Sequence, residues 1–357
     1  MELRRLIIGV FTGAVGAILA MLAMAYLPAN VHYRITETYQ FSSPVETDVT
    51  LKVLVPRDGP YQTVSLHDPV WSGAFEVQET ESIDVVALRG TLAPGTHEAS
   101  VSYSARIRQG RARWDGSVEP DHLAPHPRIE SDHPDIIAKA SELGEGTTRR
   151  DAYGIFTFVA GHLTHPSGDR VNVRFTALDA LRSGEGVCED HSQLLVALLR
   201  ARGIPARMVS GLAFQGSLLT LPFGRGTARQ WNHPGVAHAW VELFTGKQWE
   251  MAEPTWVTSE LVGSYYFGRS SGEHLSYGDD ILRGALYEQI RDQVAEEGHI
   301  VGAMSAPLKF VAAATAEGVS FTPMASVAKG WDGRWLNGLV VFIIPLLVGC
   351  KLTKRNV

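Results

Sequence analysis

The segment from Leu181 to Pro205 constrains the fold of this 357-residue chain more than any other. Gly184 and Gly186 allow a tight turn, and the leucine stripe over residues 194–199 then predicts a buried helix. Gly203 suits the end of that helix, and the proline two residues later prevents its continuation. The segment therefore predicts a turn that leads into a core helix.

Cys188 falls in the first turn of this predicted helix, beside the acidic residues Glu189 and Asp190. The positive end of a helix favours such acids, stabilises a thiolate, and offers free N–H groups to a developing oxyanion. The other cysteine, Cys350, lies in an apolar C-terminal stretch. Cys188 is therefore unpaired in the body of the chain, either as a buried filler or as a reactive thiol.

A nucleophilic thiol needs a base, and the segment 237–254 offers one. It reads as two strands joined at Thr245-Gly246. A two-residue loop would place His238 directly opposite Glu253, where side chains are about 5 Å apart. The carboxylate would then orient the imidazole and stabilise its charged form. A longer loop would shift this register.

The combination of these blocks resembles the transglutaminase-like superfamily over about residues 150 to 260. The resemblance is carried by Gly186-Val-Cys188-Glu-Asp190, Gly203-Ile-Pro-Ala-Arg207, Gly211, His238-Ala-Trp-Val-Glu242 and Glu253-Pro-Thr-Trp256. It implies an α+β fold with a papain/transglutaminase-like catalytic domain and a Cys-His-acid triad. Cys188 would be the nucleophile, His238 the general base and acid, and Glu253 the third member, where the family usually has Asp.

We expect Trp240, His191 and Gly186 to line the substrate site. Trp240 could instead belong to the core, and His191 could pack or cap the helix. No cofactor and no metal are expected. A histidine cluster lies near the proline-rich stretch, where solvated linker side chains are the simpler interpretation than metal ligands; its members are His122, His126 and His133.

The pattern along the chain divides it into successive parts. Alternating strands such as Tyr33–Phe41 predict a small β-sandwich at 30–123, a module that bacterial members of the superfamily often carry. A proline-rich linker at 124–134 leads to the catalytic domain at 135–265, with helices at 135–143 and 148–163. A C-terminal extension at 266–333 contains a helix at 279–294 and an irregular linker at 312–330.

The two ends of the chain are apolar. Residues 1–29 predict a transmembrane anchor, preceded by Arg4 and Arg5, with a cleaved signal peptide as the alternative. Residues 334–351 predict a second transmembrane helix, with a buried C-terminal helix as the alternative. Two spans would leave the catalytic domain facing the periplasm or cell exterior from a bacterial inner membrane, with membrane lipid as a partner.

The net charge of −6 and the lack of a basic block argue against a nucleic-acid partner. The sequence therefore predicts a thiol-dependent acyl-transfer enzyme acting on peptide or amide bonds of a peptide or protein substrate. Hydrolysis by a cysteine peptidase or amidase and cross-linking by a transglutaminase-like acyltransferase both stay open. The alternative is a catalytically inactive interaction module of the cell envelope.

Overall fold

The structure is a computed structural model of the chain. It describes residues 2–67, 70–71, 75–82, 84–144, 146–166, 175–214, 229–230, 237–257, 266–305 and 309–341. The helices are α1 (Glu2–Tyr26), η1 (Pro120–His122), α2 (Pro134–Glu142), α3 (Arg149–His162), α4 (Ala177–Ser183), α5 (Cys188–Ala201) and α7 (Asp280–Glu297).

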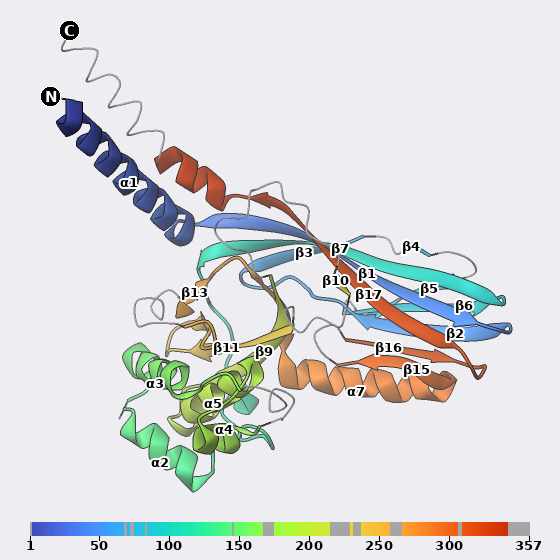
Figure 1. Cartoon of the computed structure of the whole chain (residues 1–357). Helices are drawn as coiled ribbons and strands as arrows, with labels where there is room; N and C mark the ends of the chain where they lie inside the picture. The colour runs from blue at the N-terminus through green and yellow to red at the C-terminus, as the bar shows by residue number, and fades with distance from the viewer. Residues whose placement is uncertain are drawn as a thin grey trace.

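The strands form three sheets (Figure 1). The long sheet contains β1 (Ala29–Ser43), β3 (Gln62–Leu66), β4 (Val70–Trp71), β7 (Gly95–Arg111), β10 (Arg229–Gln230), β13 (Arg269–Ser270) and β17 (Ser320–Asp332). The second sheet contains the predicted catalytic residue His238 and is called the catalytic sheet for that reason. It has the order β14-β9-β11-β12-β8, built from β8 (Arg113–Trp114), β9 (Ala206–Ala213), β11 (Ala237–Phe244), β12 (Trp249–Ala252) and β14 (His274–Asp279). The outer sheet has the order β15-β16-β2-β6-β5, built from β2 (Thr47–Leu54), β5 (Phe75–Ser82), β6 (Val85–Leu92), β15 (His299–Met304) and β16 (Lys309–Ala314).

The catalytic sheet is covered on both faces. On one face the leucine stripe of α5 packs with Val241 and Leu243 of β11, and α2, α3 and α4 complete this core. On the other face Trp240 and Met251 pack against the long sheet. The helix α5 is buried on nearly all sides, which explains its unbroken apolar run, and its first turn holds Cys188 at the edge of the core.

One face of the long strands β1 and β7 contributes side chains to two hydrophobic cores. The first half of β1, with Val31 and Ile35, packs against the catalytic sheet, and the second half, with Tyr39 and Phe41, packs against the outer sheet. The remaining face of the outer sheet is covered by α7. The long sheet therefore joins the catalytic sheet to the outer sheet, and in Figure 1 it runs from the side of α1 to the far end of the outer sheet.

Several predicted elements are present as expected. The alternation in Tyr33–Phe41 corresponds to β1, whose side chains are buried at every second position. The helices expected at 135–143, 148–163 and 279–294 are α2, α3 and α7. The capping residues also follow the sequence, because Thr148 accepts from the N–H of Asp151 at the start of α3.

The irregular linker expected at 312–330 is wrong. This part of the chain forms β17, which pairs with β1 over its whole length, and the end of β16, which pairs with β2. Pro323 and the small residues around it obscured the strand. Within the described residues only two positions of β17 pair on its other side, with β10, so a residue without an N–H is tolerated there.

The chain segments expected as separate parts share sheets. The expected extension at 266–333 supplies strands to all three sheets, and it contributes His274 and Tyr277 to the catalytic sheet through β14. The expected sandwich at 30–123 supplies β8 to the catalytic sheet. Backbone pairing between distant segments decides this arrangement, and local periodicity does not report such pairing.

Both ends of the described chain project on the same side (Figure 1). The helical residues 334–341 lie beside α1, since Asn337 donates to the carbonyl of Pro28 over 3.2 Å. Among the residues that the structure describes, no helix is long and apolar enough to cross a membrane, so the transmembrane helix expected at 1–29 is not supported. Most of the one expected at 334–351 lies outside the described residues, which end at 341. Cys350 lies outside the described residues.

Candidate active site

The turn before α5 places Cys188 at the first helical residue. Gly184 ends α4 in the left-handed conformation with φ of 68°, which an L side chain rarely adopts. The N–H of Gly186 donates to the carbonyl of Thr164 over 3.0 Å, and that of Val187 donates to the Asp190 carboxylate over 2.8 Å. A side chain at Gly186 would lie 2.7 Å from the Cβ of Asp190, so the position requires glycine.

His238 lies on β11, opposite Gly211 of β9, and is largely buried. Its Nε2 donates to Oε2 of Glu253 over 2.6 Å. Burial lowers the pKa of His238, but the charge of Glu253 and hydrogen bonds with Cys188 and Glu253 outweigh it and raise this pKa to about 10. His238 is therefore an imidazolium at neutral pH, with Nε2 on Glu253 and Nδ1 left for the thiol.

The register of the β11–β12 hairpin differs from the sequence prediction. Phe244 pairs with Trp249 and Glu242 pairs with Met251, because the connection spans Thr245 to Gln248. His238 and Glu253 are therefore diagonal neighbours across the hairpin. A slip of two residues keeps both side chains on one face, and the long glutamate side chain covers the greater separation.

Glu253 directly follows β12 and is fully buried. Its Oε1 accepts from the N–H of Thr255 over 2.7 Å. Its Oε2 accepts from His238 and also from Nε2 of His274 over 3.2 Å. Burial raises the pKa of Glu253, but the charge of His238 and the hydrogen bonds from both histidines hold it well below its usual range. Glu253 is therefore a fixed carboxylate.

His274 is the site residue that the sequence did not indicate. It begins β14, opposite Ala213 of β9, and no part of its ring is exposed. Burial lowers its pKa and dominates over the raising effect of Glu253, so the ring is neutral. With one N–H to give, it donates from Nε2 to Glu253 and accepts at Nδ1 from the Ser271 hydroxyl over 3.1 Å. No local motif around His274 signals this pairing.

Trp256 covers the paired histidines. Its ring stacks on His238 with centroids 4.9 Å apart and lies 4.5 Å from the ring of His274. The side chain is half-buried, whereas His238 and Glu253 next to it are largely and fully buried. Because water weakens charge pairs, this cover strengthens the pairing of His238 with Glu253.

The three residues that we expected to line the substrate site are all buried. Trp240 is fully buried below the site, and its Nε1 donates to the Tyr61 hydroxyl over 3.0 Å. His191 is buried on α5 and its Nδ1 contacts the Val187 carbonyl at 3.0 Å. Gly186 is buried in the turn against Asp190. These residues shape the site from below, whereas Cys188 is half-exposed.

Ligand-type atoms of His238, Glu253 and His274 lie within 4.8 Å of one another, a grouping that could hold a metal ion. The same atoms form the hydrogen bonds of the site, since Nε2 of His238 and Nε2 of His274 both donate to Oε2 of Glu253. The linker histidines have structural contacts: His122 packs edge-on against Trp249, and His133 caps α2.

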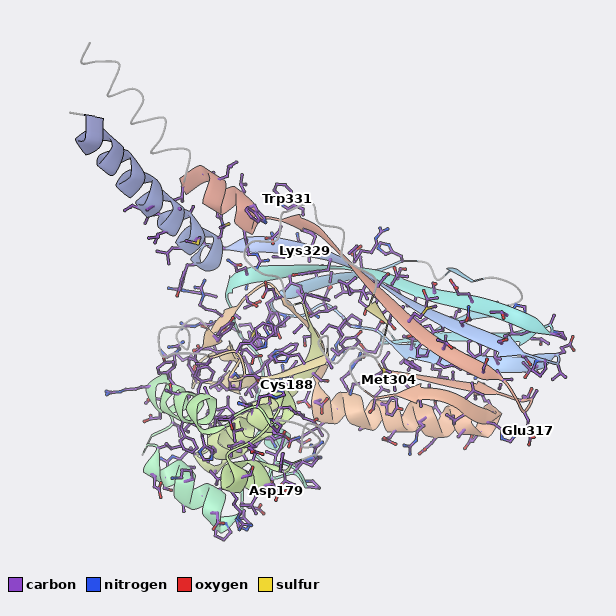
Figure 2. All side chains as sticks on the ribbon, in the orientation of Figure 1. Asp179, Cys188, Met304, Glu317, Lys329 and Trp331 are labelled. Carbon is purple, nitrogen blue, oxygen red and sulfur yellow. The ribbon has the colours of Figure 1, made fainter. Side chains whose placement is uncertain are left out.

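Cys188, labelled in the lower part of the molecule in Figure 2, begins the helix α5, which packs against β11, the strand of His238. The arrangement provides a thiol at a helix start, a charged imidazole and a buried carboxylate in sequence. Such a chain of groups can hold a thiolate–imidazolium pair. The sequence pattern singled out these three residues as the candidate nucleophile, base and acid, and their roles stay a prediction.

Comparison with known proteins finds a partial sequence relative. A protein of Mycobacterium leprae without assigned function is 36% identical over 83 residues, which are 23% of this chain and 26% of that protein. The chain thus spans about a quarter of the length of this curated relative.

Solved structures of low identity are also similar. A candidate cysteine protease from Cytophaga hutchinsonii has 16% identity and a TM-score of 0.44, over 85% of this chain and 100% of that chain. The periplasmic domain of TgpA from Pseudomonas aeruginosa has 16% identity and a TM-score of 0.30, over 67% of this chain and 91% of that chain.

The family assignment rests on the sequence match to a family model. The model of the transglutaminase-like superfamily matches residues 137–254, a range that contains Cys188, His238 and Glu253. Residues 137–254 of this chain therefore belong to the transglutaminase-like superfamily.

Proposed function

We propose that the protein is a thiol-dependent acyl-transfer enzyme that acts on peptide or amide bonds through Cys188, His238 and Glu253. The observation that carries this proposal is the position of His238. Its Nε2 donates to the buried Glu253 carboxylate over 2.6 Å, and the half-exposed Cys188 lies close enough to raise the pKa of His238. An imidazolium held in this way stabilises a thiolate at neutral pH.

In the proposed reaction the Cys188 thiolate attacks the substrate carbonyl carbon and forms a C–S bond. The N–H groups at the start of α5 stabilise the negative charge on the carbonyl oxygen. As the C–N bond breaks, His238 gives its Nδ1 proton to the leaving amine. His238 is then neutral and accepts a proton from the group that attacks the thioester, while Glu253 keeps the ring oriented.

The acyl acceptor separates hydrolysis from cross-linking. Attack by water gives a carboxylic acid and completes peptide or amide hydrolysis, whereas attack by a substrate amine gives a new amide. We favour hydrolysis, because water is in excess around the half-exposed thiol. Incubation with a glutamine-containing peptide and a labelled primary amine distinguishes the two, since only cross-linking incorporates the label.

A thiol-directed probe tests the nucleophile. The measurement uses the full chain with Cys350→Ser as background, so that Cys188 is the only cysteine. A neutral chloroacetamide probe should label this protein at pH 6.5, and Cys188→Ala should abolish both labelling and peptide hydrolysis. Labelling that persists in the Ala variant would rule out Cys188 as the reactive group.

An inactive interaction module is the second candidate, favoured by Glu253 in the position where the family usually has Asp. It predicts that Cys188 reacts with the probe only as fast as an ordinary thiol with a pKa near 8.5. Rapid labelling at pH 6.5 together with turnover of any peptide library member would exclude it. Slow labelling and no turnover would support it.

We also propose that the catalytic domain works outside the cytoplasm. The charged pair Arg4 and Arg5 precedes the apolar stretch of α1, and no positive residue follows until Arg34. A membrane-impermeant maleimide applied to intact cells should label Cys188 in the Cys350→Ser background. Labelling that requires cell lysis would contradict this location.

A further inference from the structure

A second histidine, His274, contacts the proposed catalytic acid Glu253. Nε2 of His274 is 3.2 Å from Oε2 of Glu253, the same oxygen that His238 contacts at 2.6 Å. The ring is fully buried, and Ser271 contacts its other nitrogen at 3.1 Å. The order of contacts is therefore Ser271, His274, Glu253, His238 and Cys188.

We infer that His274 is a positioning residue of the proposed reaction: its N–H fixes the carboxylate of Glu253 in the place from which it holds His238. This inference rests on the proposed function and deepens it. His274 contacts neither the thiol nor the expected place of a substrate. It acts through Glu253, and Ser271 acts through His274 by fixing which ring nitrogen carries the proton.

The length of the glutamate side chain explains why such a residue is needed. Glu253 has one more rotatable bond than the aspartate usual at this position, and it reaches His238 diagonally across the hairpin. Three donors define its orientation: the N–H of Thr255 on one oxygen, and His238 and His274 on the other. Without His274 the shared oxygen keeps one donor, and the carboxylate regains rotational freedom.

The neighbouring charges agree with a neutral donor at His274. The titratable groups that act on it are Glu253 and His238, and the titratable groups that act on His238 are Glu253 and Cys188. His191 of α5 also feels the charge of Glu253. A second imidazolium beside His238 would repel it, so the neutral state of His274 supports the thiolate–imidazolium pair.

Two amide variants of matched chemistry test the inference. Gln places its amide N–H near the position of imidazole Nε2, whereas Asn ends one methylene earlier and falls short of Glu253. The readout is the rate at which iodoacetamide alkylates Cys188 as a function of pH, in the Cys350→Ser background. It needs no substrate and reports the thiolate population directly.

We expect His274→Asn to move the acid limb of the rate profile up by about one pH unit, which is about a tenfold loss of rate at any pH on that limb. We expect His274→Gln to stay within about threefold of the wild type. His122→Gln, at a buried histidine outside the site, should leave the profile unchanged. Equal profiles for the Asn and Gln variants would overturn the inference, whether both resemble the wild type or both are impaired.

The remaining outcomes are also decisive. If the substitutions at 274 prevent folding, Ser271→Ala removes only the partner that fixes the tautomer, and a smaller upward shift is expected. No shift in that variant would overturn the role of the Ser271–His274 pair. A wild-type acid limb near pH 8.5 would instead refute the proposed function, because Cys188 would then be an ordinary thiol.

Discussion

Two glutamates of this chain, Glu37 and Glu253, are both fully buried, and their surroundings shift their pKa values in opposite directions. Burial alone raises the pKa of each. Around Glu253 the charge and hydrogen bond of His238 and the hydrogen bond of His274 outweigh burial. Around Glu37 the hydrogen bonds come from tyrosines, which offset burial only in part, and the pKa rises to about 7.

The positions of the two residues differ as well. Glu37 lies on β1 between the half that packs on the catalytic sheet and the half that packs on the outer sheet. Tyr39 donates to one of its oxygens, and Tyr103, which is itself 2.7 Å from the Tyr277 hydroxyl, donates to the other over 2.8 Å. These hydroxyls satisfy a neutral or a charged acid, whereas the partners of Glu253 require a carboxylate.

The comparison teaches that hydrogen-bond count does not decide the charge of a buried acid here. Each glutamate accepts from at least two side chains, and only Glu253 faces a side chain that carries a positive charge. A charged partner at close range in a dry site offsets the cost of burial. Glu253 is therefore charged throughout the neutral pH range, whereas Glu37 takes up a proton below its pKa of about 7.

Removal of the positive partner should have the largest effect. His238→Gln keeps a hydrogen-bonding amide but loses both the imidazolium and the proton that the leaving amine requires. We expect turnover to fall by about 10³-fold or more, as for other bases of nucleophilic triads. Steady-state hydrolysis of a reporter peptide measures it. Turnover within tenfold of the wild type would mean that another group serves as the base.

Substitution of the two glutamates themselves comes next. Glu253→Gln should lower turnover by about 10²-fold to 10³-fold, because the pKa of His238 then falls from about 10 toward its usual value and the thiolate is lost at neutral pH. Glu37→Gln is the matched control, since it removes an equally buried carboxylate outside the site. Equal losses of turnover in both variants would point to a general folding defect, and the two glutamates would then not differ in their effect on the site.

The sequence predicted the members of the site better than their geometry. The motif order singled out Cys188, His238 and Glu253 as candidates, because a nucleophile, a base and an acid need fixed residue types, and the structure shows the hydrogen bond between the last two. The counted hairpin gave the wrong register, since the real connection is two residues longer. The pairing survived because a shift of two residues preserves the face of a strand. A shift of one would have separated the two side chains.

Features made by distant segments could not be predicted in the same way. His274 reaches Glu253 only because β14 pairs with β9, and nothing in the local pattern of either strand encodes that choice of partner. The same holds for β17, which lies beside β1 although about 280 residues of chain separate them. Local periodicity identifies strands, and tertiary packing selects their neighbours.

The raised pKa of Glu37 predicts a pH dependence of stability. Between its unfolded value of about 4.5 and its folded value of about 7, the native state binds a proton that the unfolded state has lost. Stability therefore falls as pH rises through this window, by about 3 kcal/mol in total for this group. Urea unfolding at pH 5 and pH 8 measures it, and Glu37→Gln should remove that part of the slope. An identical slope in the variant would show that Glu37 is not protonated in the fold.

The smallest change in the free energy of unfolding is expected from removal of a single hydroxyl group, that of Tyr39. Tyr39→Phe keeps the ring in the core of the outer sheet and removes one neutral donor to Glu37. At pH 8, where Glu37 is a carboxylate, we expect a loss of about 1–2 kcal/mol, because a charged acceptor loses a hydrogen bond. At pH 5 the acid is neutral and the loss should be smaller. A larger loss at pH 5 than at pH 8 would mean that the tyrosine stabilises the protonated acid, and the contrast with Glu253 would then rest on burial and not on the charge of the partner.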